Sequence, residues 1–288
     1  MSDVSLLTLV RGREDHLANL IRGLGAQQHV PCELIIAYMQ PEPHRGLPPC
    51  PCPVVEVHVE GGPLPLAAAR NLAARRASGS MLVFLDVDCV PSPSLVYRYA
   101  EALETTPGVF MGEVYYLPAL GEAGMPLPLD YAWLDTVGFP HPAKPTFSPG
   151  LERVDDHGQL WGLSFAIDRG TFFACGGMDE RFVGYGAEET DFAATLHAHD
   201  VTLYRVSDAR CYHQHHAVYR PPLHHLESIV HNAALFYAKW GRWCMEYWLE
   251  QLARAEYIRW TSDHIEILRR PSPQEIEAAR LDPAHRFG

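Results

Sequence analysis

The segment MLVFLDVD at residues 81–88 decides the fold. Its five leading apolar residues predict a strand buried on both faces, as in the middle of an α/β sheet. Unpaired carboxylates are costly to bury, so we expect Asp86 and Asp88 at the open C-terminal end of the strand. Open α/β sheets bind ligands at that edge, and hard divalent cations prefer carboxylate and phosphate oxygens. The segment therefore predicts a metal–diphosphate site; the alternative is a strand followed by an acidic turn.

The residues around this strand alternate between strand and helix patterns. We expect strands at Val4–Val10, Glu33–Met39 and Val54–Val59, and helices from Asp15 onward, at Leu66–Ala77 and at Pro93–Thr105. Such alternation predicts an α/β fold with a mostly parallel central sheet flanked by helices. The sequence has no Gly-x-Gly-x-x-Gly loop after the first strand and no Walker phosphate loop, which excludes the two commonest nucleotide-binding motifs of this architecture.

The second half of the chain is less regular. We expect strands at Val114–Tyr116, Trp161–Ile167 and Val201–Val206, and a short helix at Arg169–Ala174. The Pro- and Gly-rich segment 108–154 is long for a loop, which is typical of a functional or mobile segment. A substrate-gating loop and a disordered insert both remain open. Residues 223–252 predict one long helix, and residues 271–288 a loosely attached polar end.

Composition limits the class of partner. The 288 residues carry a formal charge of −12, and 47% are apolar. The negative charge argues against nucleic acid as a partner. No stretch approaches 18 consecutive apolar residues, so no transmembrane segment is expected. The N-terminus lacks a signal-peptide pattern, and the seven scattered cysteines suggest reduced thiols; both favour a cytoplasmic location.

Two further clusters could carry chemistry. Glu188, Glu189 and Asp191 open a predicted helix after a glycine-rich turn. Acidic residues there complement the helix dipole, and they could also supply a general base. His213, His215 and His216 follow a predicted strand within four positions, a pattern that favours metal ligation.

Together these motifs resemble the inverting GT-A glycosyltransferases of family 2, with a C-terminal segment similar to that of the β-galactosyltransferases. The resemblance covers roughly residues 4–240. It rests on ARN at 69–71, ASG at 77–79, FLDVD at 84–88, GGMDE at 176–180, GAEETD at 186–191 and YHQ at 212–214. The chain departs from the family in having Glu188-Glu189 where Glu-Asp is usual, and Tyr38-Met39-Gln40 where acidic residues often follow the second strand.

The resemblance implies a GT-A domain and a metal-dependent hexosyltransferase. Its nucleotide-sugar-binding half is expected at residues 1–106, its acceptor-binding and catalytic half at 107–222, and a C-terminal helical extension at 223–288. The donor is expected to be a nucleotide sugar, with UDP favoured. The acceptor is expected to be a hydroxyl or amine on a small molecule, a glycan or a carrier. We also expect that the protein is able to form a homo-oligomer.

The resemblance also implies roles for individual residues. Asp88 and His213 are expected to hold Mn²⁺ or Mg²⁺, with Asp86 as a further ligand or a ribose contact and His215 or His216 as alternates. Glu189 is the expected base, and Glu188 and Asp191 the expected acceptor-side carboxylates. The expected donor contacts are Thr8, Val10, Arg11, Arg13, Arg70, Asp86, Val87, Asp88, Trp161 and Gly162. The alternatives are a nucleotidyltransferase acting on a sugar phosphate, and a non-catalytic carbohydrate- or metal-binding protein.

Overall fold

The computed structural model describes residues 3–120 and 126–285 of the chain, and a central sheet organises them. Its strands are β1 (Val4–Val10), β2 (Glu33–Tyr38), β3 (Val54–His58), β4 (Met81–Leu85), β5 (Cys89–Pro91), β6 (Val109–Tyr116), β7 (Phe139–Pro140), β8 (Leu151–Val154), β9 (Ser164–Asp168) and β10 (Leu203–His213). Their order is β3-β2-β1-β4-β9-β6-β10-β5, with β7 paired to β6 and β8 to β10.

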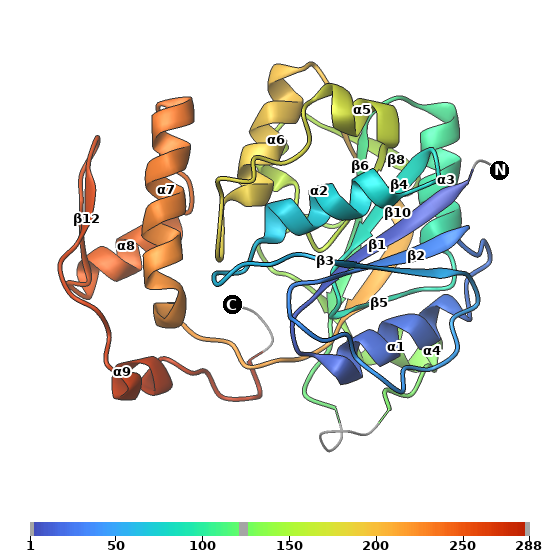
Figure 1. Ribbon diagram of the computed structural model, residues 1–288, viewed down its shortest axis with the longest axis horizontal. Coiled ribbons are helices and arrows are strands. Elements are labelled where there is room, and N and C mark those ends of the chain that lie inside the picture. The colour runs from blue at the N-terminus through green and yellow to red at the C-terminus, as the bar shows by residue number, and fades with distance from the viewer. Residues whose placement is uncertain (1–2, 121–125, 286–288) are drawn as a thin grey trace.

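Helices cover both faces of this sheet (Figure 1). They are α1 (Glu14–Leu24), α2 (Leu66–Arg76), α3 (Leu95–Thr105), α4 (Tyr131–Val137), α5 (Arg169–Ala174) and α6 (Glu188–Ala198). The C-terminal elements are α7 (Leu226–Trp240), α8 (Glu246–Arg254), β11 (Ile258–Trp260), β12 (Ile265–Ile267) and α9 (Pro273–Ala278). These last elements lie together at one end of the molecule, beside α6 (Figure 1). Among the described residues, no helix combines the length and apolar character needed to cross a bilayer.

Strand β4 is buried on both faces, as its composition predicts. Leu82 and Phe84 pack with residues of α2 and α6, while Val83 packs on the opposite face with residues of α1 and α3. This alternation follows from the two-residue period of a strand. It places the two cores on either side of β4 and leaves the residues after Leu85 at the edge of the sheet.

Six strands of the sheet run in one direction, which confirms the mostly parallel prediction. Strand β9 is the central exception, because it pairs antiparallel with both β4 and β6. It begins at the same edge where β4 ends, with Leu85 opposite Ser164. The segment preceding β9 is irregular and supplies no helical crossover, which a parallel neighbour would need. The glycine-containing turn before β9 is thereby brought next to Asp86.

Three regions differ from the sequence-based expectation. The segment 108–154 is not a single loop: it contains β6, α4, β7 and β8, although residues 121–125 lie outside the described part. The helix expected over 223–252 is divided by residues 241–245, where Gly241 and Met245 adopt left-handed backbone conformations. The end of the chain is not simply loose. Ser272 and Glu275 form a capping box that starts α9, while residues 286–288 lie outside the described part.

Candidate active site

The ends of β4 and β10 meet at one edge of the sheet. After β4, the backbone N–H of Asp86 donates to the carbonyl of Leu163, at 2.9 Å. Two residues later the carbonyl of Asp88 accepts from Gln214 N–H, at 2.7 Å. Asp88 is therefore tied beside the end of β10, which delivers His213. Segments more than a hundred residues apart in sequence form one site.

Asp88, His213 and His216 form a group of potential metal ligands. Their ligand atoms lie within 4.8 Å of one another. The two imidazole Nε2 atoms are 3.6 and 3.7 Å from Asp88 Oδ2. Burial alone would raise the pKa of Asp88, but His213, Arg13 and His216 lower it to about 2. Burial lowers the pKa of His213 to about 4. A charged carboxylate and neutral imidazoles are the protonation states that bind a divalent cation.

The other two predicted metal residues lie differently. Asp86 does not belong to the ligand group found among the described residues; its Oδ1 accepts from Arg70 Nη2, at 3.1 Å. Burial and Asp88 raise the pKa of Asp86 to about 6, although Arg70 opposes them. The imidazole of His215 does not belong to the group of Asp88, His213 and His216. The backbone carbonyl of His215 contacts His16 Nε2, at 3.3 Å.

Arg70 links the donor-side carboxylate to the acidic start of α6. It is buried and also donates to Glu188 Oε1, at 3.2 Å. The next residue, Glu189, accepts from the backbone N–H of Gly162 at 3.2 Å. Burial first, and then the charge of Glu188, raise the pKa of Glu189 to about 7. A carboxylate with a pKa near neutrality is suited to accept and release a proton.

Asp191 has a different environment from the two glutamates. It is 1% exposed, and its oxygens accept from Lys239 Nζ at 2.8 Å and from Trp240 Nε1 at 2.7 Å. Both partners belong to α7. The carboxylate thus joins α6 to the C-terminal helices, a role that the acidic sequence pattern alone did not reveal.

The predicted arginine contacts after β1 also have distinct partners. Arg13 forms an ion pair with Asp88, beside the ligand group. Arg11 instead donates to the carbonyls of Met39, Gly61 and Gly62 and so connects the chain after β1 to the segments after β2 and β3. Of these two arginines, Arg13 is the one that contacts a predicted metal ligand, Asp88.

Four further predicted donor contacts, Thr8, Val10, Val87 and Gly162, are buried. The hydroxyl of Thr8 has no hydrogen-bond partner among the described residues. The carbonyl of Val10 accepts from Met39 N–H, at 2.9 Å. At Gly162 a Cβ atom would lie 2.5 Å from Glu189 Oε2 and 3.0 Å from Arg70 Nη2, so the backbone approaches both side chains closely.

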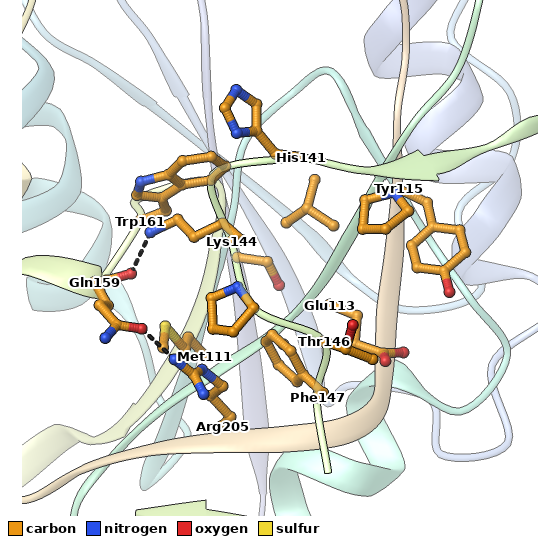
Figure 2. A pocket seen from close by; sticks show the side chains of 15 residues that line it. Met111, Glu113, Tyr115, His141, Lys144, Thr146, Phe147, Gln159, Trp161 and Arg205 are labelled. Carbon is orange, nitrogen blue, oxygen red and sulfur yellow. Dashed lines mark hydrogen bonds between the residues drawn. The ribbon is translucent and has the colours of Figure 1, made fainter. Parts of the chain in front are cut away.

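Lys144 is a site residue that the sequence reasoning missed. Its ammonium group lies 3.9 Å from the centre of the Trp161 ring and donates to the carbonyl of Gln159, at 2.7 Å. Figure 2 shows it among the residues that line a small cavity of about 70 Å³ beneath Trp161. Burial lowers the pKa of Lys144 to about 8, although Glu189 opposes this. Lys144 is the only formally charged residue between positions 137 and 151. An isolated charge in an otherwise uncharged segment was the feature of the sequence that could have identified it.

Two family models match the chain. The model described as "Glycosyl transferase family 2" matches residues 54–169, and the model described as "N-terminal domain of galactosyltransferase" matches residues 151–217. Validoxylamine A glucosyltransferases from Streptomyces hygroscopicus subsp. jinggangensis (strain 5008) and subsp. limoneus are each 28% identical over 155 residues, or 48% of this chain. That region is 36% and 34% of the two relatives, so the chain spans about a third of their length.

Solved structures share the fold. GalNAc-T7 with UDP, GalNAc and Mn²⁺ superposes with a TM-score of 0.53 at 15% identity, covering 75% of this chain and 44% of that one. S. aureus TarS 1–349 in complex with UDP-GlcNAc gives 0.54 at 14% identity, covering 82% and 66%. The family matches and the shared fold confirm the predicted resemblance to the GT-A glycosyltransferases of family 2.

Proposed function

We propose that this protein is a glycosyltransferase, and that it transfers a sugar from a UDP-sugar to an acceptor hydroxyl or amine, with inversion and with the help of Mn²⁺. One observation carries the proposal. The group Asp88, His213 and His216 lies at the same sheet edge as Glu189, a half-buried carboxylate of near-neutral pKa, and the two are connected through Asp86, Arg70 and Glu188. A donor site and a general base at one edge are what a single displacement requires.

The residues of the ligand group suit a divalent cation. One carboxylate oxygen and two imidazole nitrogens make a mixed donor set that favours Mn²⁺ over Mg²⁺. Such a cation, when bound, stabilises the negative charge that develops on the departing diphosphate, an effect worth several kcal/mol. The solved structure of GalNAc-T7 with UDP and Mn²⁺ and that of TarS with UDP-GlcNAc support UDP as the nucleotide and Mn²⁺ as the ion.

On the donor side, side chains are proposed to bind the nucleotide sugar and hold it in position. Arg13, paired with Asp88 in this structure, is placed to exchange that partner for the phosphates. Asp86 contacts the ribose or the sugar, and Arg70 fixes its direction from the buried side. Thr8, Val10 and Val87 are buried, and they support from below the backbone that the nucleoside contacts.

The acceptor side is proposed to work through Glu189. This carboxylate takes the proton of the acceptor as the acceptor atom attacks the anomeric carbon. The bond from that carbon to the diphosphate oxygen breaks, and its electron pair leaves with the nucleotide. The Gly162 N–H keeps one Glu189 oxygen in place, and Arg70 holds Glu188 as a buried neighbour that keeps the pKa of Glu189 high.

Replacing the base tests this proposal. Glu189→Gln should lower the release of UDP from the UDP-sugar by ~10²–10⁴-fold, the usual contribution of a positioned general base. The affinity for UDP with Mn²⁺ should stay nearly unchanged, because Glu189 is on the acceptor side. UDP release with a coupled assay and calorimetric titration of UDP measure the two quantities.

Glu250→Gln provides the matched control, since Glu250 is exposed on α8 and forms its ion pair with Arg254 in the same helix. It should retain full turnover. Turnover of Glu189→Gln within a few-fold of the unmodified chain would remove Glu189 from the role of base.

A further inference from the structure

Cys50 and Cys52 form a pair of thiols in the segment between β2 and β3. Their Sγ atoms are 3.6 Å apart, and both cysteines are free. A disulfide bond is about 2.05 Å long, so the two sulfur atoms need to approach by about 1.5 Å to bond. Side-chain rotation, with a small adjustment of the exposed Pro51 between them, covers a shift of this size. The two thiols are therefore close to the geometry in which they can join.

Proline restricts the backbone around the pair. Pro49, Pro51 and Pro53 each have a fixed φ angle, and each also limits the conformation of the residue before it. The chain bends at Pro51 and Cys52, and the thiols are held close together. Closing a ring between the two sulfur atoms therefore costs less conformational entropy here than it would in a flexible segment.

The pair is accessible to small molecules. Both cysteines are half-buried: they pack on the core on the α1 side of the sheet, while the proline between them is exposed. A hydrogen bond from the Cys52 thiol lowers the pKa of Cys50 to about 7, although burial opposes it. A thiol with that pKa is about half ionised at neutral pH, and the thiolate is the form that attacks a disulfide.

Two close thiols could also bind a metal ion, but the surroundings of this pair do not favour that use. Structural zinc takes four protein ligands, usually cysteine and histidine. Within residues 3–120 and 126–285, the groups of three or more close potential ligands include neither Cys50 nor Cys52. Cys32, a further thiol of this region, instead contacts Ser5 Oγ at 3.9 Å. The pair lacks the additional ligands that a zinc site needs.

The pair is also remote from the candidate active site. Cys52 precedes the start of β3 by two residues, and β3 belongs to the parallel set formed with β1, β2 and β4. The metal-ligand candidate Asp88 follows the end of β4, so the thiols lie at the opposite edge of the sheet. Any chemistry of the pair is therefore separate from the proposed sugar transfer.

We infer that Cys50 and Cys52 are a reversible redox site, which exchanges with small-molecule disulfides and thiols such as the glutathione couple. The Cys50 thiolate attacks one sulfur of the small disulfide, so that a mixed disulfide forms and one thiolate leaves. Cys52 then loses its proton to solvent and attacks Cys50 Sγ, which closes the Cys50–Cys52 bond and releases the second thiolate. The two cysteines lose two electrons, and the small disulfide gains them and becomes two thiols. An excess of small thiol reverses both steps.

Glutathione disulfide is the probe that tests this inference. The reduced full chain is incubated with it at neutral pH, quenched with acid, alkylated with N-ethylmaleimide under denaturing conditions and digested with trypsin. The tryptic peptide of residues 46–70 contains Cys50 and Cys52 and none of the other five cysteines. Mass spectrometry should show that this peptide carries no alkyl group and has lost two hydrogen atoms, while the Cys32 peptide stays alkylated. Reduced glutathione in excess should restore both alkylation sites.

Three variants separate the steps. Cys52→Ser should stop at the mixed disulfide, with one glutathione on Cys50, because no second thiol is present to close the ring. Cys50→Ser should react about threefold or more slowly, because the more acidic thiol is gone. Cys32→Ser is the matched control and should leave the oxidation of the pair unchanged. Thermal melting checks that each variant is folded.

Three results would overturn the inference. They are a peptide 46–70 that stays doubly alkylated in excess glutathione disulfide, a mixed disulfide that accumulates in the unmodified chain without closing, and a bond from Cys32 to either member of the pair. The chain unfolded in urea gives a further comparison, because it no longer holds the two thiols close together. Its pair should be oxidised less at the same glutathione ratio, and equal oxidation would show that the fold does not prepare the site.

Discussion

The surroundings of Glu189 determine its pKa. Burial and the neighbouring Glu188 raise that pKa to about 7. A base must be unprotonated to act. We therefore expect kcat/KM to rise with pH on the acid side, with a slope of one on a logarithmic plot, and to level off above about pH 7. An activity profile from pH 5 to 9 measures this. A flat profile over pH 5–7 would mean that another group accepts the proton.

Gly162 sets the position of that base. A Cβ atom there would meet Glu189 Oε2 at 2.5 Å and Arg70 Nη2 at 3.0 Å, and Arg70 is not free to move far because it is buried and paired with Asp86 and Glu188. Gly162→Ala should therefore lower turnover by about tenfold or more, as small displacements of reacting groups do. Gly62→Ala, in the exposed segment after β3, gives a comparison, since nothing lies within 4 Å of its Cβ position and its backbone is not left-handed. Unchanged turnover in Gly162→Ala would show that this close approach is not needed.

Sequence reasoning could place part of this site at the residue level. Asp88 and His213 each follow an apolar strand, so their position at the sheet edge was predictable, and the structure brings them together. The choice of His216 over Asp86 as the third member was not predictable. It depends on where Arg70 and the irregular residues after β10 direct these side chains, and no periodicity encodes that. Lys144 was missed for the same reason.

At the scale of elements, Asp191 fastens α6 to α7. Asp191→Ala leaves the Trp240 N–H without its partner and leaves Lys239 with only its longer contact to Asp179, at 3.3 Å. We expect the free energy of unfolding to fall by about 1–3 kcal/mol, because the buried Trp240 N–H loses its hydrogen bond to a charged group. Denaturant titration measures the change. Asp155→Ala, which removes a 91% exposed carboxylate side chain, should change it little; a similarly small loss in Asp191→Ala would contradict the assigned role.

The order of elements was largely predictable, because apolar periodicity and glycine positions mark strands, helices and their ends. The direction of β9 was not, since it depends on an irregular segment that returns to the edge where β4 ends. The break between α7 and α8 was missed because apolar residues continue through it, although Gly241 was a readable stop signal. The capping box of α9 was readable as well.

At the scale of the whole molecule, the sheet gathers distant segments at one edge. The ends of β4 and β10, the turn before β9 and the start of α6 meet there, while α8 and the segment 139–143 enclose a cleft beside them. Parallel order made the existence of such an edge predictable. The cleft was not, because its two walls come from parts of the chain whose packing only the folded structure defines.

The most direct test of the central claim, a nucleotide-sugar site completed by a metal ion, is a thermal-shift panel of UDP-, GDP- and dTDP-sugars with and without Mn²⁺. Ligand present at 100 times its Kd stabilises by about 2.7 kcal/mol. We predict that a UDP-sugar raises Tm by several degrees only when Mn²⁺ is present, and that Asp88→Ala abolishes the shift while Asp155→Ala keeps it. No shift with any donor, or the same shift in Asp88→Ala as in the unmodified chain, would contradict the claim.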